Sequence, residues 1–254
     1  MSTFFKNFPL IAYNFGNETD PALFQNISAY IKVIDEIAND IAFYTTIHIQ
    51  DYDRPDSLSF KLYRTTQFYW TFYYLNDDVR ESGWPLPQQD LLPKAKVDYP
   101  HQTVITTGNI SKTFLPGHTV KGSLSGSTGT VVKRYLDLGQ IIIDSPNNFN
   151  AGENITPSIN GVEQTADFVV VTSNVEQFNS VHHYENSSKD YVDIGLVPSG
   201  IGTGAFPSLS GKTPVTYFER ILDKNDALRE IKVLKPNVAQ QVQQEFTKLL
   251  LQEF

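Results

Sequence analysis

The sequence predicts an α+β protein, because helix patterns and strand patterns fall in different stretches of its 254 residues. Helical spacing of apolar and aromatic residues dominates the first third, whereas short β-branched runs between Gly, Ser and Asn turns dominate residues 99–172. We expect an extended apolar arm at 1–19, a helix plus a strand–helix–helix module at 20–95, an inserted β-rich module at 96–180, and a loop-rich return segment with strands and a C-terminal helix at 181–254.

The N-terminal arm is unusually apolar. It begins with Phe4, Phe5 and Phe8 and then alternates along residues 10–15. Such alternation favours an extended strand with one apolar face. An apolar arm at a terminus is ordered only when it docks somewhere, so we expect it to lie on its own domain or on a neighbouring protein.

Residues 20–43 have the pattern of a long amphipathic helix. Asp20 can cap its N-terminus, and Pro21 suits its first position. The apolar residues follow at spacings of three and four, which places them on one stripe that consists of Phe24, Ile27, Ile31, Ile34, Ala38 and Ile41. This stripe suits packing on the domain's own core, and it also suits packing on a partner helix.

A strand and two short helices are expected next. Residues 44–50 are β-branched and aromatic, which predicts a strand, and the turn at 51–55 leads to a helix capped by Asp56 or Ser57 that reaches Tyr63. A second helix at 67–75 is dense in aromatic residues and ends at Asn76. The run Gly-Trp-Pro-Leu-Pro at 83–87 breaks the chain.

The central region predicts a small antiparallel barrel or sandwich, with the Gly- and Ser-rich stretch 122–130 serving as hairpin turns. Its predicted strands are 103–106, 119–122, 130–132, 140–143 and 167–171. Residues 173–214 are expected to be loop-rich. Strands follow at 214–218 and 231–234, with a short turn or helix beginning at 226–229, and residues 237–254 predict a helix.

Composition and charge argue against several classes of function. The net charge of −8, without a basic run, is a poor match for a nucleic-acid phosphate backbone. Cysteine is absent, which removes disulfides, thiol catalysis and Cys-based metal sites. No apolar stretch reaches the ~20 residues of a membrane span, and the N-terminus lacks the pattern of a secretory signal. We therefore expect no nucleic acid and no membrane among the partners.

Aromatic residues are frequent, at 13% of the chain, while charged residues make up only 19%. Aromatic side chains bury large areas and dominate the energetics of interfaces. A Tyr-rich core and a surface buried against partners would both explain this balance, and composition leaves the two open.

Patterns for catalysis and phosphate binding are missing. The stretch 122–126 has Leu124 at its centre, where a nucleophile elbow needs Ser. The glycines at 200, 202 and 204 are followed by Pro207 before a helix could form, so they do not predict a dinucleotide loop. The acidic pairs Asp51/Asp53 and Asp77/Asp78 suit turns and helix ends. We expect no enzyme activity and no cofactor.

A metal site is not expected either. His182 and His183 are the only neighbouring histidines, and successive residues of a strand point to opposite faces. On that argument the two rings could not hold one ion together. The nearby Asp190 and Asp193 do not complete a spacing typical of a metal site.

The order of elements in 44–76 resembles the LysM module, in which a strand precedes two short helices and the second helix ends in Asn. Asp53, Arg54 and Arg64 stand where the typical module has glycine. The resemblance implies either a glycan-binding module, which would recognise peptidoglycan through residues 44–95, or a protein-binding module.

A longer set of motifs resembles the baseplate wedge protein fifty-three family of contractile-tailed bacteriophages. The resemblance covers about the first 90 residues and the last 40, whereas residues 96–210 depart from the family. The motifs, in order, are 4–13 (FFKNFPLIAY), 54–56 (RPD), 61–63 (KLY), 68–78 (FYWTFYYLNDD), 83–86 (GWPL), 215–219 (VTYFE) and 225–234 (NDALREIKVL). Glycines and apolar residues within 114–155 are similar to small β units of phage structural proteins.

This resemblance implies a structural subunit of the virion, assembled in the host cytoplasm and located in the tail baseplate. Its partners would be other wedge proteins, the hub- and tube-initiating proteins and the sheath-initiating protein, with copies repeated around a sixfold ring. We expect the contacts to use Phe4, Phe5, Phe8, Trp70, Tyr73, Trp84, Val242, Phe246 and Leu249. Peptidoglycan binding stays open as an alternative, and a tail hydrolase is a third hypothesis.

Overall fold

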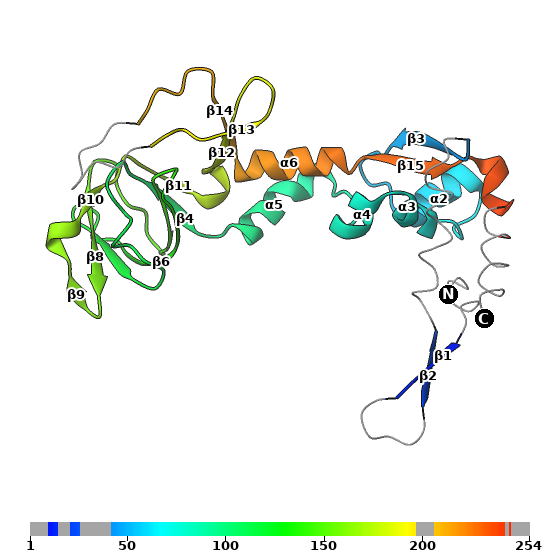
Figure 1. Cartoon of the computed structure of the whole chain (residues 1–254), viewed down its shortest axis with the longest axis horizontal. Helices are drawn as coiled ribbons and strands as arrows, with labels where there is room; N and C mark the ends of the chain where they lie inside the picture. Colours follow the sequence, from blue (N-terminus) through cyan, green and yellow to red (C-terminus); the bar gives the residue numbers. More distant parts are fainter. Residues whose placement is uncertain (1–9, 15–20, 26–41, 197–205, 242–243, 245–254) are drawn as a thin grey trace. The chain divides into compact units, whose positions relative to one another are not determined.

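The computed structural model describes residues 10–14, 21–25, 42–196, 206–241 and 244. It contains helices and antiparallel sheets, so the chain belongs to the α+β class (Figure 1). The chain forms two units. Unit 1 combines the N-terminal part up to Gln88 with the C-terminal part from Lys224, and unit 2 is the intervening segment Gln89–Asp223.

Among its described residues, unit 1 contains two separate two-stranded sheets, three short helices before residue 88 and a C-terminal helical segment at 236–241. It also includes the last residues of α6, most of which belongs to unit 2. The elements are β1 (Leu10–Tyr13), β2 (Ala22–Gln25), β3 (Tyr44–His48), α2 (Pro55–Tyr63), α3 (Trp70–Leu75), α4 (Asp77–Ser82) and β15 (Glu230–Leu234). The predicted strand at 44–50, the two helices after it and the strand at 231–234 are confirmed. Helix α4, directly after Asn76, was not predicted.

Strand β15 pairs antiparallel with β3, although the whole of unit 2 lies between them in the sequence. Figure 1 shows the two strands side by side. One face of this pair, with Ile47, Ile231 and Val233, packs on a core that includes Leu58 of α2 and Phe72 of α3. Phe72 is fully buried. The late strand thus completes a β-α-α-β arrangement around one core.

Helix α2 begins differently from the prediction, which placed its cap at Asp56 or Ser57. Arg54 is the N-cap, and Pro55 occupies the first helical position, where its missing N–H costs nothing. Ser57 contributes from the third position, because its hydroxyl accepts the Arg54 N–H at 3.0 Å. Helix α2 ends at Arg64, whose φ of 60° lies in the left-handed region usual for a helix terminus.

The strand predicted within 10–15 is confirmed as β1, which forms a hairpin with β2. The helix predicted from residue 20 is wrong for residues 22–25, which form β2. Backbone pairing with β1 outweighs the helical spacing of Phe24 there, as tertiary context often overrides propensity. The rest of that predicted helix, 26–41, lies outside the described residues, as do Phe4, Phe5 and Phe8 of the arm.

Unit 2 begins with helix α5 (Gln88–Asp98) and contains most of the strands. These are β4 (Gln102–Ile105), β5 (Thr119–Gly122), β6 (Thr128–Tyr135), β7 (Gln140–Asp144), β8 (Asn154–Ile159), β9 (Val162–Glu163), β10 (Val169–Val170), β11 (Ser173–Glu176), β12 (Val181–Glu185), β13 (Tyr191–Val192) and β14 (Thr213–Thr216). Two short 3-10 helices, η3 (Thr165–Asp167) and η4 (Gln177–Asn179), interrupt them, and helix α6 (Tyr217–Ala227) follows.

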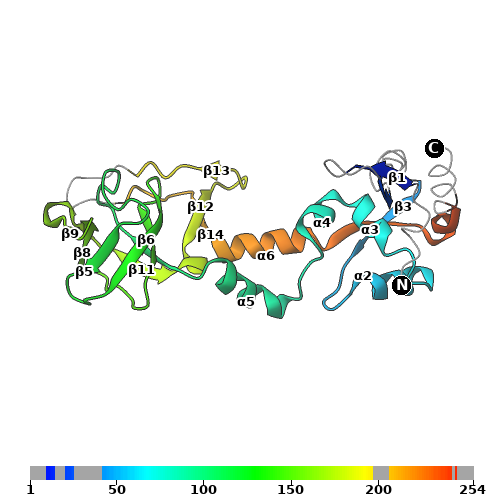
Figure 2. The same cartoon turned by 90° about the horizontal axis from the view of Figure 1, so that it is seen from below.

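The main sheet of unit 2 closes into a small barrel. Its strand order is β10-β8-β5-β6-β7-β4-β11, and β10 and β11 are neighbours along the chain. One bent segment therefore pairs with β8 through β10 and with β4 through β11. Between them, the N–H of Val171 donates to the Glu153 carbonyl and the N–H of Thr172 to the Ile105 carbonyl. The sequence predicted a small antiparallel barrel or sandwich, and the structure is the barrel. Figures 1 and 2 show its strands curving around one interior.

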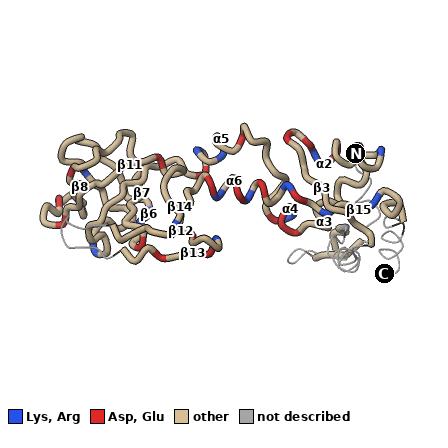
Figure 3. The backbone as a smooth tube through the Cα atoms, turned by 90° about the horizontal axis from the view of Figure 1, so that it is seen from above, with Lys and Arg blue, Asp and Glu red and all other residues tan. Residues whose placement is uncertain are grey.

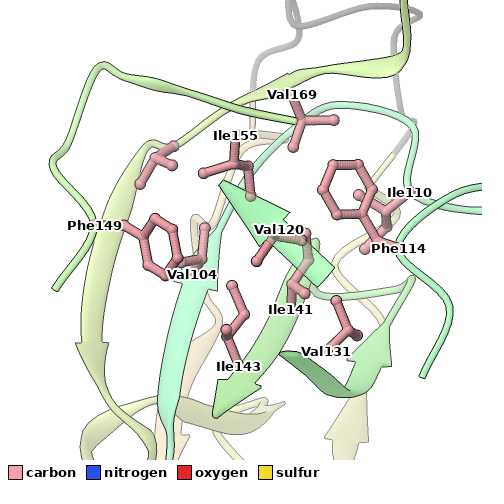
Figure 4. Packing of buried hydrophobic residues seen from close by; sticks show 11 residues of the cluster. Val104, Ile110, Phe114, Val120, Val131, Ile141, Ile143, Phe149, Ile155 and Val169 are labelled. Carbon is pink, nitrogen blue, oxygen red and sulfur yellow. The ribbon is translucent and has the colours of Figure 1, made fainter. Parts of the chain in front are cut away.

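The barrel interior is filled by apolar side chains from its strands and loops (Figure 4). Phe114 and Phe149, both from loops, join Val120, Ile141 and Ile155 in this cluster. The inward residues are nearly inaccessible to solvent, so the barrel is a packed core rather than a ligand cavity.

Several elements differ from the prediction. Helix α5 was not predicted, and the loop-rich segment 173–214 also contains β11, β12 and β13. The strand predicted at 214–218 ends at Thr216, where α6 begins. The turn or helix predicted to begin at 226–229 is instead the end of α6, which stops at Ala227, and a turn at 228–229.

The predicted C-terminal helix is helical in its described part, residues 236–241 and 244. Ala239 is buried there against Phe68, Leu75 and Leu234 of unit 1. Val242, Phe246 and Leu249, which the sequence suggested as contacts, lie outside the described residues.

Candidate interaction surfaces

Side chains close the outer edge of β15. The Asn76 amide, at the end of α3, accepts the N–H of Lys232 at 2.8 Å and donates to its carbonyl at 2.9 Å, as a neighbouring strand would. Farther along, the Tyr63 hydroxyl donates to the Leu234 carbonyl at 2.9 Å. Burial raises the pKa of Tyr63 to about 12, so this donor keeps its proton at neutral pH.

Within the described residues, the outer edge of β3 has no strand paired to it. The Ile49 N–H donates to the Arg229 carbonyl, and the Phe43 carbonyl accepts from Lys235, so odd-numbered residues of β3 bond to β15. The backbone groups of Tyr44, Thr46 and His48 therefore point away from β15. Within the described part of the chain, the only bond to them is a long one, 3.4 Å, from the Gln50 amide to the His48 carbonyl.

The turn between β3 and α2 is held by polar contacts. The carboxylate of Asp53, which is 9% exposed, accepts the Gln50 N–H at 3.2 Å and pairs with Lys61. The Asp53 carbonyl accepts the indole N–H of Trp84 at 2.6 Å. Trp84 also packs on the core of unit 1, beside Phe72 and Tyr73. Asp53 thus has a structural role, as its turn position suggested.

Arg229 and Asn225 connect this turn to the segment that follows Trp84. The Arg229 guanidinium donates to the carbonyls of Ile49 at 3.3 Å and Leu86 at 2.9 Å, and it pairs with Asp51. The Asn225 amide exchanges two hydrogen bonds with the backbone of Leu86, at 2.8 and 3.1 Å. Sequence reasoning missed both residues, because nothing local links 225–229 to 49–51.

A groove of about 640 Å³ lies beside the end of α3. It is lined by Thr46, Leu75, Asn76, Asp77, Asp78, Val79, Ala227, Leu228, Glu230, Ile231 and Lys232. Its charged groups have opposite signs, and Asp77 is paired with Arg80 at 2.9 Å.

Unit 2 contains a smaller pocket of about 280 Å³ at the β12–β13 pair, which includes His182, His183 and Tyr191 among its lining residues. The prediction that the two histidines face opposite ways is wrong, since their Nδ1 atoms are 2.9 Å apart. An irregular register in β12 between Val181 and His183 disturbs the alternation. His183 also contacts Glu185 through Nε2 at 2.9 Å and stacks on Tyr191. Among the described residues, no group of three or more His, Asp or Glu could hold a metal ion.

Glu153 organises the loops at one end of the barrel. It is 1% exposed, and its carboxylate accepts the backbone N–H groups of Leu124, Ser125 and Asn150 at 2.6–2.9 Å, along with the Ser125 hydroxyl. Burial alone would raise the pKa of Glu153, but these hydrogen bonds outweigh burial and lower it. The predicted hairpin at 122–130 is confirmed, with Glu153 binding its turn.

The aromatic residues suggested as contacts lie inside unit 1 where they are described. Trp70 is 5% exposed, and Tyr73 and Trp84 are half-buried around Phe72. They therefore contribute to a Tyr- and Trp-rich core, one of the two explanations that composition left open. A further role for them in contacts with another protein stays a prediction.

The hairpin of β1 and β2 exposes its large apolar side chains, which are Leu10, Ile11, Tyr13, Leu23 and Phe24. Neither strand contains a charged residue. Elsewhere in the described chain, acidic and basic residues are intermixed along α4, α5 and α6 (Figure 3). None of the helices in the described part is long and apolar enough to cross a membrane.

The chain was compared with protein-family models and with curated proteins, and neither comparison found a match.

Proposed function

We propose that the chain is a structural subunit of a contractile phage tail baseplate, joining wedge components and neighbouring wedges around the tail hub by protein–protein contacts. One observation carries this proposal. The family-like motifs at 54–56, 61–63, 68–78 and 83–86 and the late motif at 225–234 all belong to unit 1, where β15 from the late motif pairs with β3, whereas the motif at 215–219 lies at the end of unit 2. Most of the resemblance, although split along the sequence, thus falls in one unit.

The surfaces of the described chain support the same role. Its acidic residues at turns are used in structural contacts, such as Asp51 with Arg229 and Asp53 with Lys61. The hairpin and the β3 edge offer apolar and backbone groups that suit another protein. On this proposal the partners are other wedge proteins and the proteins that initiate the tube and the sheath, with six copies in the ring.

The test is to find the chain in purified particles of the phage that encodes it. Mass spectrometry of washed, intact tails should detect it at a fixed ratio to other baseplate proteins, near six copies per tail. Detection only in the soluble fraction of infected cells, with none in the particles, would reject the proposal.

Peptidoglycan binding is a second candidate, favoured by the β-α-α-β arrangement that resembles LysM. The turn that follows β3 is occupied by the chain's own Trp84 and Arg229, which leaves less room for a glycan there. Co-sedimentation with cell-wall sacculi tests this candidate. Retention that Tyr69→Ala abolishes would favour it, and Tyr69 is a better probe than the buried Trp70 because it is half-exposed.

A further inference from the structure

Among the residues that the structure describes, the β3–β15 sheet has one edge bonded by side chains and one edge without a partner. Asn76 and Tyr63 satisfy the outward backbone groups of β15. The outward groups of Tyr44 and Thr46 on β3 have no such partner within the described chain. Natural proteins usually protect an edge strand with charged residues, Pro or a covering segment, because an exposed edge can pair with another strand.

Strand β3 carries none of the usual sequence protection. Its residues, Tyr-Thr-Thr-Ile-His, include no Pro, Lys or acidic residue, and Figure 3 shows no Lys, Arg, Asp or Glu on it. Thr45, Thr46 and His48 are exposed, so the edge is accessible as well as unpaired. Such a strand can accept an extended segment by main-chain hydrogen bonding.

The hairpin of β1 and β2 has the complementary properties. It forms a sheet of its own, separate from the β3–β15 pair, so the two do not pair within one chain. Its strands are four residues each, uncharged, and apolar on both faces, since Leu10 and Leu23 lie on one face while Ile11 and Phe24 lie on the other. An isolated two-stranded hairpin is marginally stable in water and gains from further strands.

We propose that the β1–β2 hairpin of one copy adds to the β3 edge of a second copy. The hairpin and the edge are different patches of the same chain, so the contact is heterologous. The second copy keeps its own hairpin available for a third, and the series closes into a ring when the rotation per copy allows it. This inference rests on the proposed function, which requires repeated copies around a ring.

The absence of cysteine allows a direct test by disulfide cross-linking of the full chain. One variant carries Thr46→Cys, and its mixing partners carry Leu10→Cys, Ala12→Cys or Leu23→Cys singly. Residues opposite each other on neighbouring strands have Cα atoms about 4.5–5.5 Å apart, which suits a disulfide. We expect at least one mixture to give a heterodimer under oxidation that neither variant gives alone.

The companion substitution is Thr46→Pro, which removes an outward N–H without removing a bond to β15. It should abolish the cross-link between His48→Cys and the hairpin cysteine that gives the strongest heterodimer. Thr46→Ala keeps the N–H and should preserve the cross-link. Circular dichroism melting tests whether each variant is folded. If Thr46→Pro does not fold, His48→Lys serves as the second disruption of the edge, and its effect is measured on the cross-link of Thr46→Cys.

Three results would overturn the inference. The first is that no mixture gives a heterodimer. The second is that a disulfide forms only in a single chain that carries both cysteines, and the third is a cross-link that Thr46→Pro leaves unchanged. The cross-link uses purified chain alone, so it is independent of whether the chain is found in phage particles. A chain present in particles without the cross-link would retain the proposed function and reject the hairpin exchange.

Discussion

Glu153 shows how a single side chain holds separate loops of unit 2 together. Its carboxylate accepts backbone N–H groups from residues on both sides of the barrel end, those of Leu124, Ser125 and Asn150. Gly122 leaves room for this arrangement, because a Cβ there would lie 2.4 Å from the Ser125 hydroxyl and 2.7 Å from a carboxylate oxygen of Glu153.

Replacing Glu153 by Gln should destabilise unit 2 by about 1–3 kcal/mol at neutral pH, because it removes the charge that strengthens these hydrogen bonds. The lowered pKa of Glu153 means that its contribution is present above 4.5, the ordinary value, and is lost as pH falls through the lower folded pKa. Melting temperatures between pH 7 and pH 3 should therefore fall more steeply for the natural chain than for Glu153→Gln.

Glu163→Gln is the matched control for this titration. Glu163 lies in the same unit but is about half-exposed in its pair with Lys121, and an exposed pair contributes little. Its loss should change stability by less than about 0.5 kcal/mol. Equal acid sensitivity of the natural chain and Glu153→Gln would contradict the role given to Glu153.

Two glycines of the barrel allow the cost of a steric clash to be measured separately from the cost of a left-handed backbone conformation. Gly139 and Gly152 both have positive φ, but only at Gly139 would a Cβ meet the backbone, 2.0 Å from the Thr106 carbonyl oxygen. Gly152→Ala should cost roughly 1–2 kcal/mol, the penalty of the left-handed conformation. Gly139→Ala should cost about 3 kcal/mol or more, since the backbone must also move. Similar denaturation midpoints for the two would show that the close approach is absent in solution.

At the scale of elements, local pattern predicted the strands better than their partners. Strands β3, β5, β7 and β15 coincide with β-branched runs that the sequence shows directly. Helix α6 was missed although Thr216 and Glu219 form a capping box, with the carboxylate accepting the Thr216 N–H at 2.7 Å. The aromatic residues that begin this helix resemble a strand, and the cap was the signal that could have corrected it.

The pairing of β3 with β15 could not be predicted from local pattern, because neither sequence specifies its partner. The pairing depends on Asn76, the residue that the sequence identified only as a helix end. Its side chain bonds to both Lys232 backbone groups and to the Phe72 carbonyl. A long-range role of this kind becomes visible only when the fold is known.

Asn76→Ala should destabilise unit 1 by about 1–3 kcal/mol, since it leaves the Lys232 N–H and carbonyl without their partner. Asp78→Ala is the control for a general effect of mutation at this helix junction, because Asp78 is exposed and has no hydrogen bond to β15. Urea denaturation monitored by Trp fluorescence would measure the free energy of unfolding of both variants, since both tryptophans lie in unit 1. A loss at Asp78 as large as that at Asn76 would contradict the bridging role.

At the scale of the whole molecule, unit 2 is an insertion into unit 1. The chain leaves unit 1 after Gln88 and returns at Lys224. These ends are close, because Leu86 and Asn225 are hydrogen-bonded at 2.8 Å. Insertions are tolerated where the ends of the host loop lie close together.

Deletion of residues 89–223, with a linker of about four Gly and Ser residues in their place, should leave unit 1 folded. The expected result is a cooperative thermal transition and dispersed amide resonances from the shortened chain. A deletion of the same length shifted to 100–234 removes β15 and should fail to fold, since β3 loses its partner. Failure of both would show that unit 1 depends on unit 2 for its stability.

A density map of the intact tail is the decisive test of the proposed role as a repeated baseplate subunit. We expect density for unit 1 in copies around the sixfold ring, with other baseplate proteins against its surface. A map in which every part of the baseplate is assigned to other proteins, with this chain absent from the particle, would contradict it.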